Sequence, residues 1–518
     1  MLGLIKSLPQ YHGPYKVSTT ELELPCQHQE FGTATLKQTG RPALQLDTVQ
    51  ALLFYPTIDN STSTSRQPWA SRPLTSTAQG YSAFTGAPKW IIHVVLVLAS
   101  RLRLPCNTDG QLLANATTPP PPSSSSSSSS NTTLVDKSRT REHKTKADDN
   151  HKWPLVIFSH GLGGTRTTYS QYCGELASLG YIVCAIEHRD GTAPSSTVNR
   201  WNPNTTTPQH DRTVLYTRPQ DIEFKRPNKQ LTQLEYRGQQ LDMRFEEIRQ
   251  LVQVLKRLDE GDDSVARLNL RQTKNSVNTL QQWQNKIDWS KVYMTGHSFG
   301  GATTLQSLRT ERRHTFGVEF SKGIALDPWI DPIPQLSTIE RFRSPSRESL
   351  DNVNDDQTGI EDAAAAKPSM TKDDKLDIQT PLLVINSEAF TKWREHYNKV
   401  YEIVKRVQHA KAWFMTLVGS VHMSFSDFPL LSPFITRKTG SRVEPKLALN
   451  LFIQASKEFL QDQDDGDILS KPVIKGDERG TRPGEGGRDN KPMEPVGDMR
   501  MHYKFRSTTT QQQKQARL

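Results

Sequence analysis

The chain has 518 residues, a formal net charge of +10 and a pI near 9.2, yet only 34% of its residues are hydrophobic. A chain of this polarity is not packed throughout, so we expect much of it to be loop or tail. Its 65 basic and 55 acidic residues are interleaved without an aromatic-laced basic stripe, which argues against nucleic-acid binding. The four cysteines have neither zinc-ligand spacing nor disulfide-framework density.

The N-terminal residues 1–9 lack the long apolar core of a secretory signal, and Leu2 excludes N-myristoylation. The longest apolar run, residues 91–99, has about half the length that a transmembrane helix needs. We therefore expect a soluble cytoplasmic protein. Basic residues flank this run, so residues 89–103 are predicted to form either a buried core helix or an interfacial helix in peripheral contact with a membrane surface.

Strands and helices alternate through most of the chain. Residues 51–56 predict an early strand, and a continuous apolar strand at 154–158 is of the kind that is buried on both faces of a parallel sheet. The further predicted elements are a helix over 169–179 stopped by Gly180, strands at 181–186, 291–295, 323–326, 381–385 and 413–417, and helices over 241–255 and 449–460. This alternation predicts a doubly wound α/β layer, with ligands at the carboxyl ends of the strands.

The strand at 291–295 runs directly into Gly296-His297-Ser298-Phe299-Gly300. This is the G-x-S-x-G nucleophile elbow, in which a serine occupies a strained turn between a strand and a helix of an α/β-hydrolase. Ser298 is therefore the candidate nucleophile. A serine hydroxyl is a poor nucleophile, so it needs a histidine base, and that base needs a carboxylate to hold its tautomer.

The order serine, acid, histidine expected of an α/β-hydrolase is present in the sequence. His422 lies just beyond the last predicted parallel strand and is the candidate base. Two carboxylates compete for the acid: Asp327 ends the strand at 323–326, and Glu388 follows the next strand. The fold-level argument does not choose between them. Asp427 is predicted to stabilise a loop.

Acyl transfer also needs hydrogen-bond donors for the developing oxyanion. One is the backbone N–H of the residue after the nucleophile, Phe299. The second comes from the loop Ser159-His160-Gly161-Leu162-Gly163-Gly164, a His-Gly-rich segment of the type found in lipases and esterases. Leu162 N–H is the predicted second donor.

Several motifs together resemble one family, the platelet-activating factor acetylhydrolases of the plasma and related intracellular type. They are, in chain order, residues 158–163, Glu187-His188-Arg189-Asp190, residues 296–303, Leu326-Asp327-Pro328-Trp329, residues 385–388, residues 419–422 and residues 425–428. The resemblance extends from about Pro154 to Leu460. It implies an α/β-hydrolase fold with a mostly parallel sheet and helices on both faces.

The resemblance also implies site residues and a reaction. It carries over Ser298 as nucleophile, Asp327 as acid, His422 as base, and Leu162 and Phe299 as oxyanion donors. It implies calcium-independent hydrolysis of the sn-2 ester of phospholipids whose acyl chain is short or oxidised, with no cofactor and no metal. Two alternatives are a cutinase-like or general carboxylesterase, and a catalytically inactive α/β-hydrolase module used for binding.

The predicted organisation is one catalytic domain with insertions. Its parts are an N-terminal portion at 1–106 with the early strand and the apolar helix, a low-complexity insertion at 107–150, a catalytic body at 151–462 interrupted by a disordered insertion at 335–378, and a disordered tail at 463–518. The insertions and tail are too polar to bury a core of their own.

Overall fold

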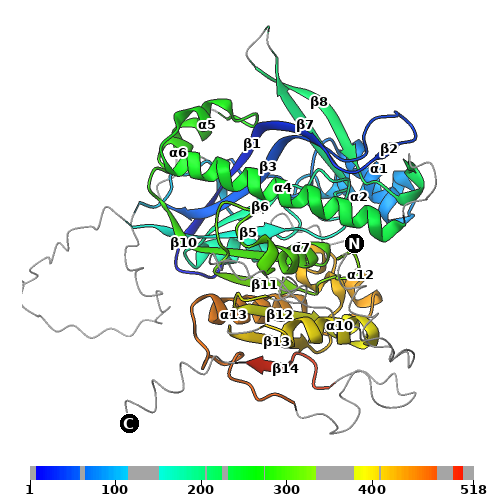
Figure 1. The fold of residues 1–518 in the computed structure, drawn as a ribbon, viewed down its shortest axis with the longest axis vertical. Helices are drawn as coiled ribbons and strands as arrows, with labels where there is room; N and C mark the ends of the chain where they lie inside the picture. The colour runs from blue at the N-terminus through cyan, green and yellow to red at the C-terminus, as the bar shows by residue number, and fades with distance from the viewer. Residues whose placement is uncertain are drawn as a thin grey trace, which may run out of the picture.

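A mixed, mainly parallel sheet forms the centre of the computed structural model (Figure 1). The structure describes residues 8–58, 65–114, 151–202, 204, 207–224, 232–273, 275–333, 378–407, 410–474 and 494–505. The sheet has 10 strands in the order β14-β13-β12-β11-β10-β5-β6-β3-β1-β4. Their bounds are β1 Lys16–Glu30, β3 Gln45–Thr57, β4 Asn107–Thr108, β5 Trp153–Ser159, β6 Ile182–Ile186, β10 Ile287–His297, β11 Lys322–Leu326, β12 Leu382–Ser387, β13 Ala412–Leu417 and β14 Met499–Phe505.

The six strands from β6 to β13 are parallel, and the antiparallel strands lie at the two sides. β3 pairs antiparallel with both β6 and β1, and β14 pairs antiparallel with β13. Every residue of β6, β11, β12 and β13 is buried, because helices cover both faces of the sheet and neither face is open to solvent. The α/β-hydrolase architecture predicted from the sequence is confirmed.

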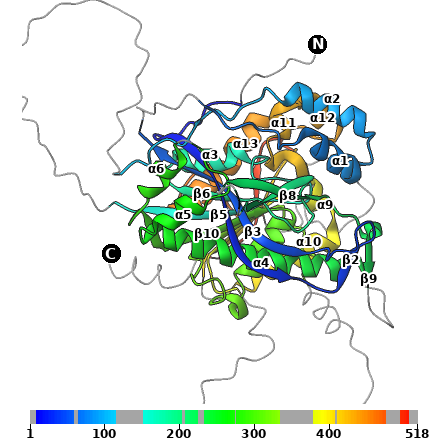
Figure 2. The same ribbon diagram turned by 90° about the horizontal axis from the view of Figure 1, so that it is seen from above.

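Helices on the two faces complete the layers, with α4 and α10 on one side of the sheet and α3 and α13 on the other (Figure 2). The helices are α1 Leu74–Thr85, α2 Lys89–Ala99, α3 Ser170–Ser178, α4 Gln233–Asp259, α5 Asp263–Leu268, α6 Ser276–Gln281, α7 Phe299–Ser307, α9 Glu388–Lys392, α10 Arg394–Lys405, α11 Phe428–Leu431, α12 Pro433–Lys438 and α13 Pro445–Leu460. Short 3₁₀ turns cover Pro219–Asp221, Thr310–Arg312 and His422–Phe425. Two small pairs lie beside the sheet: β2 Ala34–Leu36 with β9 Ile222–Phe224, and β7 Ser195–Trp201 with β8 Pro208–Leu215.

Local sequence signals account for the ends of the helices nearest the site. The long helix α4 starts at a capping box, in which the Thr232 hydroxyl accepts from the Glu235 N–H while the Glu235 carboxylate accepts from the Thr232 N–H. Helix α3 ends before Gly180, whose φ of 98° is a conformation that glycine adopts without strain. The end of α3 agrees with the prediction, whereas α4 begins eight residues before the helix predicted over 241–255.

Two boundaries differ from the prediction. The insertion expected at 107–150 begins later, because residues 107–114 are packed, with β4 parallel to β1 and Leu112 buried. The tail expected at 463–518 is wrong for residues 463–474 and 494–505: Ile468 and Leu469 are buried, and residues 499–505 form β14. Met499 and Met501 are buried in alternation with more exposed residues, a period-2 pattern that a strand on a sheet edge requires. Residues 115–150, 335–377, 475–493 and 506–518 of the expected insertions and tail lie outside the described residues.

The apolar helix α2 is not part of the core. Leu96 is its one buried residue, and Trp90, Val94 and Val95 are 70%, 52% and 54% exposed. The core-helix alternative is therefore wrong. No helix among the described residues is long and apolar enough to cross a membrane.

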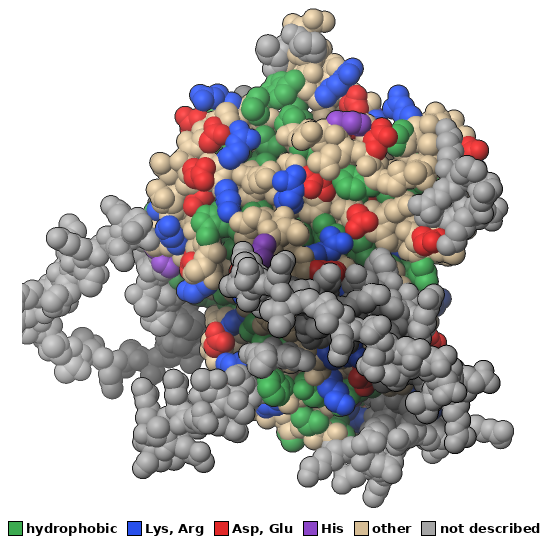
Figure 3. Space-filling model, viewed as in Figure 1, with side chains coloured by type: hydrophobic (Ala, Val, Ile, Leu, Met, Phe, Trp, Pro, Cys, Tyr) green, Lys and Arg blue, Asp and Glu red, His purple; other side chains and the backbone are tan. Residues whose placement is uncertain are grey.

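On the face of the molecule that carries α4, acidic and basic side chains are interspersed (Figure 3).

The packing of β14 can be tested at Met501, which is 1% exposed. Met501→Ala should lower the free energy of unfolding by about 2–5 kcal/mol, because it removes a buried side chain and leaves a cavity. Val496→Ala is the control, since Val496 is 38% exposed and its truncation should change stability by less than about 0.5 kcal/mol. Chemical denaturation measures both. Equal stability of the two variants would show that residues 499–505 do not pack on β13.

Candidate active site

Ser298 lies at a sharp turn between β10 and α7. Its φ of 57° and ψ of −117° are strained for any residue with a side chain, as a nucleophile elbow requires. The turn is tight because Gly296 and Gly300 lie in direct contact: a Cβ atom at Gly296 would be 2.2 Å from the Gly300 oxygen, and one at Gly300 would be 1.9 Å from the Ser159 oxygen. The two glycines of the motif are therefore required by backbone contact.

The structure brings the three predicted triad residues together. His422 Nε2 is 2.8 Å from Ser298 Oγ, and His422 Nδ1 is 2.7 Å from Asp327 Oδ2. Asp327 is fully buried, whereas the His422 side chain is 34% exposed and the Ser298 hydroxyl lies beside it. The Ser387 N–H and hydroxyl donate to the two carboxylate oxygens of Asp327 and hold it in this orientation.

Glu388, the other carboxylate considered for the acid, lies at the start of α9 and does not contact the imidazole. It accepts hydrogen bonds from the Gly419 N–H (2.7 Å) and from Arg442 Nη2 (2.6 Å). Gly419 belongs to the loop that carries His422, so Glu388 braces the backbone of that loop. Phe390 on the same helix is stacked on the His422 ring, with ring centroids 4.3 Å apart and an interplanar angle of 4°.

The predicted oxyanion loop runs directly beside the nucleophile. A Cβ atom at Gly161 would lie 2.8 Å from Ser298 Cβ, so only glycine permits this approach. Neither Leu162 N–H nor Phe299 N–H has an acceptor among the described residues. Such unpaired N–H groups beside a serine can receive a developing negative charge.

His297, the residue before the nucleophile, is a neutral neighbour of the base. Burial and the nearby His422 hold the pKa of His297 well below its ordinary value. Its Nδ1 is 2.8 Å from the hydroxyl of Tyr169, which in turn accepts from the Gly161 N–H at 3.3 Å. Since the His297 ring lies 4.5 Å from the His422 ring, an uncharged His297 avoids repulsion when His422 takes up a proton.

His297, Asp327 and His422 are also the one group of described residues whose ligand atoms are close enough to hold a metal ion, all within 4.8 Å of one another. The Nδ1 atoms of both histidines and the carboxylate already have hydrogen-bond partners. A metal ion there would have to break the bond between His422 and Asp327. The donor set therefore suits a proton relay better than a metal.

Comparison with protein families gives one assignment for this fold and site. The family model described as platelet-activating factor acetylhydrolase, isoform II, matches residues 128–347 and 368–477. The chain belongs to this family.

Individual relatives agree with the family assignment. The platelet-activating factor acetylhydrolase of Gallus gallus is 30% identical over 316 residues, which are 60% of this chain and 62% of the relative. The enzyme of the same name from Cavia porcellus is 33% identical over 316 residues, 60% of this chain and 57% of the relative. A putative phospholipase A2 of Schizosaccharomyces pombe is 27% identical over 374 residues, 64% of this chain and 74% of the relative. The chain thus spans about three fifths of the length of the animal relatives.

Among solved structures, a ferulic acid esterase from Streptomyces cinnamoneus superposes with a TM-score of 0.48 at 14% identity, covering 90% of this chain and 96% of the esterase.

A layer of buried charge behind the site was not predicted as functional, although its sequence stood among the family motifs. Each residue of Glu187-His188-Arg189-Asp190, which follows β6, is buried and has a partner from another segment. The four pairs are Glu187 with Arg166, His188 with Glu247, Arg189 with Glu23, and Asp190 with Arg244. A charged tetrapeptide directly after a buried strand was the available signal, since buried charges must be paired.

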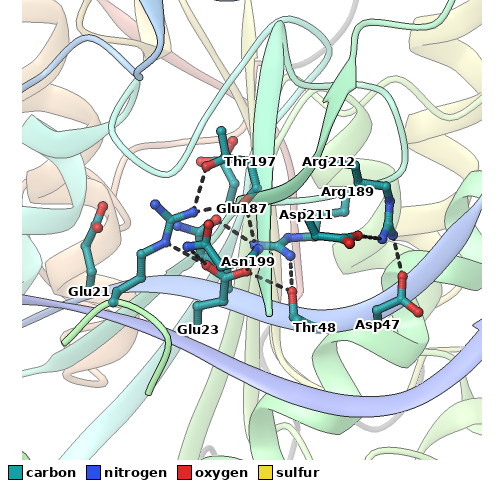
Figure 4. Close-up of polar contacts among 12 residues, drawn as sticks. Glu21, Glu23, Asp47, Thr48, Glu187, Arg189, Thr197, Asn199, Asp211 and Arg212 are labelled. Atoms are coloured by element: carbon teal, nitrogen blue, oxygen red, sulfur yellow. Dashed lines mark hydrogen bonds and ion pairs between the residues drawn. The ribbon is translucent and has the colours of Figure 1, made fainter. Parts of the chain in front are cut away.

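The outer part of this layer joins β1 to the chain after β6. Glu23, fully buried on β1, accepts from Arg189 Nη2 (2.9 Å) and Arg271 Nε (2.6 Å), and Thr48 on β3 contacts both Glu23 and Arg189 (Figure 4). Burial raises the pKa of Glu23, but Arg189 and Arg271 outweigh it and hold the pKa below its ordinary value. Glu23 is therefore a buried carboxylate that stays ionised.

The inner part holds a neutral pair. His188 Nδ1 is 2.5 Å from Glu247 Oε2, and His188 Nε2 is 2.8 Å from Ser159 Oγ. Burial and the charge of Asp190 raise the pKa of Glu247 to about 8, while burial lowers the pKa of His188 well below its ordinary value. A protonated Glu247 donates to Nδ1, and the Nε2–H of His188 donates to Ser159.

This protonation predicts a pH dependence of stability. The folded protein keeps the Glu247 proton up to about pH 8, whereas the unfolded chain loses it near the ordinary value of 4.5. The free energy of unfolding therefore falls as the pH rises through this window. Glu247→Gln keeps a donor and an acceptor but cannot ionise, so its melting temperature should rise relative to wild type between about pH 5 and 8.

Glu246→Gln is the matched control. Burial raises the pKa of Glu246, but Arg249 and Gln250 outweigh it and lower the pKa, so this carboxylate stabilises the fold when ionised. The stability from Glu246 is present above its ordinary pKa, and the control variant should melt below wild type at neutral pH. If the melting temperature of Glu247→Gln changes with pH in the same way as that of wild type between pH 5 and 8, Glu247 is ionised in the folded protein.

Proposed function

We propose that this protein is a serine esterase that hydrolyses the sn-2 ester of phospholipids bearing a short or oxidised acyl chain, a calcium-independent reaction of the phospholipase A2 type. The observation that carries the proposal is the hydrogen-bonded chain Ser298–His422–Asp327, beside which lie two backbone N–H groups with no acceptor in the described part of the chain. Family membership supports the phospholipid substrate, because the animal relatives are named platelet-activating factor acetylhydrolases.

In the proposed mechanism His422 Nε2 removes the Ser298 proton as Oγ attacks the sn-2 carbonyl carbon. Asp327 accepts from Nδ1–H, which sets the tautomer and stabilises the imidazolium. The carbonyl oxygen becomes an oxyanion and accepts from Leu162 N–H and Phe299 N–H. The intermediate collapses to an acyl-enzyme, and His422 returns the proton to the departing glycerol oxygen. Water, deprotonated by the same base, then releases the acid and restores Ser298.

Ser298→Ala tests the proposal as a whole. Turnover of a phosphatidylcholine with an sn-2 acetyl group should fall by about 10⁶-fold, because the nucleophile is lost while the fold is kept. Wild type should hydrolyse this lipid in excess chelator, should favour it over a long-chain analogue, and should react with a fluorophosphonate probe.

The two alternative functions predict other outcomes. Hydrolysis of a polyester film but not of the lipid would favour a cutinase-like enzyme. A folded wild type that the probe leaves unlabelled would be a binding module.

The assignment of the acid has its own test. Asp327→Asn should lower kcat by about 10⁴-fold, since an asparagine amide opposes the productive tautomer of the base. Glu388→Gln should cost far less, because a glutamine oxygen still accepts from the Gly419 N–H. Both variants are assayed on a soluble p-nitrophenyl ester after circular dichroism shows that they are folded. An inactive Glu388 variant with an active Asp327 variant would reverse the assignment.

We further propose that α2 contacts the surface of a phospholipid membrane. Its exposed apolar residues are Trp90, Ile91, Val94, Val95, Val97 and Leu98, and Lys89, Arg101 and Arg103 flank them. An apolar helix face with a basic edge is typical of interfacial helices. The preceding helix α1 reaches the oxyanion loop, because Phe84 packs on Gly163. A membrane on α2 would therefore lie beside the site.

Changing Val95 and Leu98 together to Asp should weaken binding to phosphatidylserine-containing vesicles by at least about tenfold, since charges replace side chains that would enter the lipid interface. Hydrolysis of a soluble ester should not change. Both positions are more than 40% exposed, so the substitution buries no charge. Leu268→Asp is the control, because Leu268 is 42% exposed on the distant helix α5. Equal vesicle binding by the double variant and the control would exclude α2 as the contact.

A further inference from the structure

Arg244 connects the two segments that supply the oxyanion donors. It lies on α4, its side chain is fully buried, and it reaches from the helix to the loop that carries Leu162. Nη1 donates to the His160 carbonyl oxygen at 2.8 Å and to Ser159 Oγ at 3.2 Å. These bonds fix the start of the oxyanion loop to α4.

The other guanidinium nitrogens fix the far side of the same loop. Nε donates to Asp190 Oδ2 and Nη2 donates to Thr192 Oγ1, both at 2.7 Å. The Thr192 carbonyl oxygen then accepts from the Gly163 N–H at 2.8 Å. The peptide between Gly161 and Leu162 is thus held on both sides, which leaves the Leu162 N–H one direction in which to point.

Arg244 also contacts the second donor segment. Its guanidinium carbon lies 4.4 Å above the centre of the Phe299 ring, and Nη1 is 3.5 Å from the Thr303 hydroxyl one turn further along α7. A planar guanidinium suits this position, because it can stack on an aromatic ring while its N–H groups form hydrogen bonds in the plane. One side chain therefore sets the spacing between the backbone of residue 162 and that of residue 299.

We propose that Arg244 is a positioning residue for the oxyanion hole, which holds the Leu162 and Phe299 N–H groups at the spacing that the tetrahedral intermediate needs. The inference rests on the proposed esterase function. The Arg244 side chain is fully buried and paired with Asp190, so it acts through the geometry of the loop and not by contact with the reacting atoms. Its contribution is expressed when negative charge develops, and it should stabilise the transition state without strengthening ground-state binding.

Arg244→Lys is the test variant, because a lysine keeps the charge but cannot make the forked and stacked contacts. On p-nitrophenyl acetate, kcat should fall by about 10- to 100-fold, less than the loss expected for removal of a whole oxyanion donor, while KM stays within about twofold. The Ki of a trifluoromethyl ketone, which forms a tetrahedral adduct with the serine, should rise in the same proportion as kcat/KM falls. A loss of packing alone would not produce this proportionality.

Arg237→Lys is the matched control. Arg237 lies on the same helix, is 2% exposed and donates to Gln240, but it does not contact the oxyanion loop or Phe299. Its kcat and inhibitor Ki should stay within about twofold of wild type. Equal losses in the two lysine variants, or an unchanged Ki in Arg244→Lys, would overturn the inference.

Thr192→Val provides a second, milder test that does not depend on the folding of Arg244→Lys. It removes the acceptor of Arg244 Nη2 and keeps the shape of the side chain. It should lower kcat and raise Ki together by a smaller factor, and a folded Thr192→Val with both values unchanged would overturn the inference. Failure of the proposed function is distinguishable, because wild type itself would then neither hydrolyse the ester nor bind the ketone.

Discussion

The arrangement of the site depends on the pairing of charges buried behind it. The strand β6 is followed by Glu187-His188-Arg189-Asp190, and all four residues are buried. A buried charge or polar group without a partner is costly, so each residue requires a partner delivered by another element. β1 delivers Glu23, and α4 delivers Glu247 and Arg244. The pairing of these four residues therefore fixes both β1, at one side of the sheet, and α4 relative to the site.

The catalytic side of the molecule uses this rigidity. Ser298 has a strained backbone, and the loop before it must approach so closely that Gly161, Gly296 and Gly300 have no room for a side chain. A strained turn persists only where its surroundings hold it. Arg244 and the neutral pair His188–Glu247 supply that hold from one side, and Tyr169 supplies it through His297 from the other.

Helix α1 packs against the oxyanion loop, whereas helix α2 after it is exposed. Phe84 packs against Gly163 of the oxyanion loop, and the helix that follows α1 exposes its apolar side chains. Asp427, predicted as a loop-stabilising acid, accepts from Trp69 Nε1 ahead of α1 and from the N-terminus of α3. A buried carboxylate thereby attaches the segment before α1 to the body, while α2, after α1, stays exposed.

The sequence by itself determined the parallel strands, the elbow around Ser298 and the order serine, acid, histidine, because buried strands are continuous apolar runs and a strained turn demands glycine at fixed spacing. It did not reveal β14 or the β7–β8 hairpin, whose short polar strands are stable only once paired. Only the tertiary structure decided that Asp327 contacts the imidazole while Glu388 braces the base loop, and that α2 is exposed. Residues such as Arg244 and Glu247 carry no local signal, because their role follows from partners far away in the chain that only folding brings near.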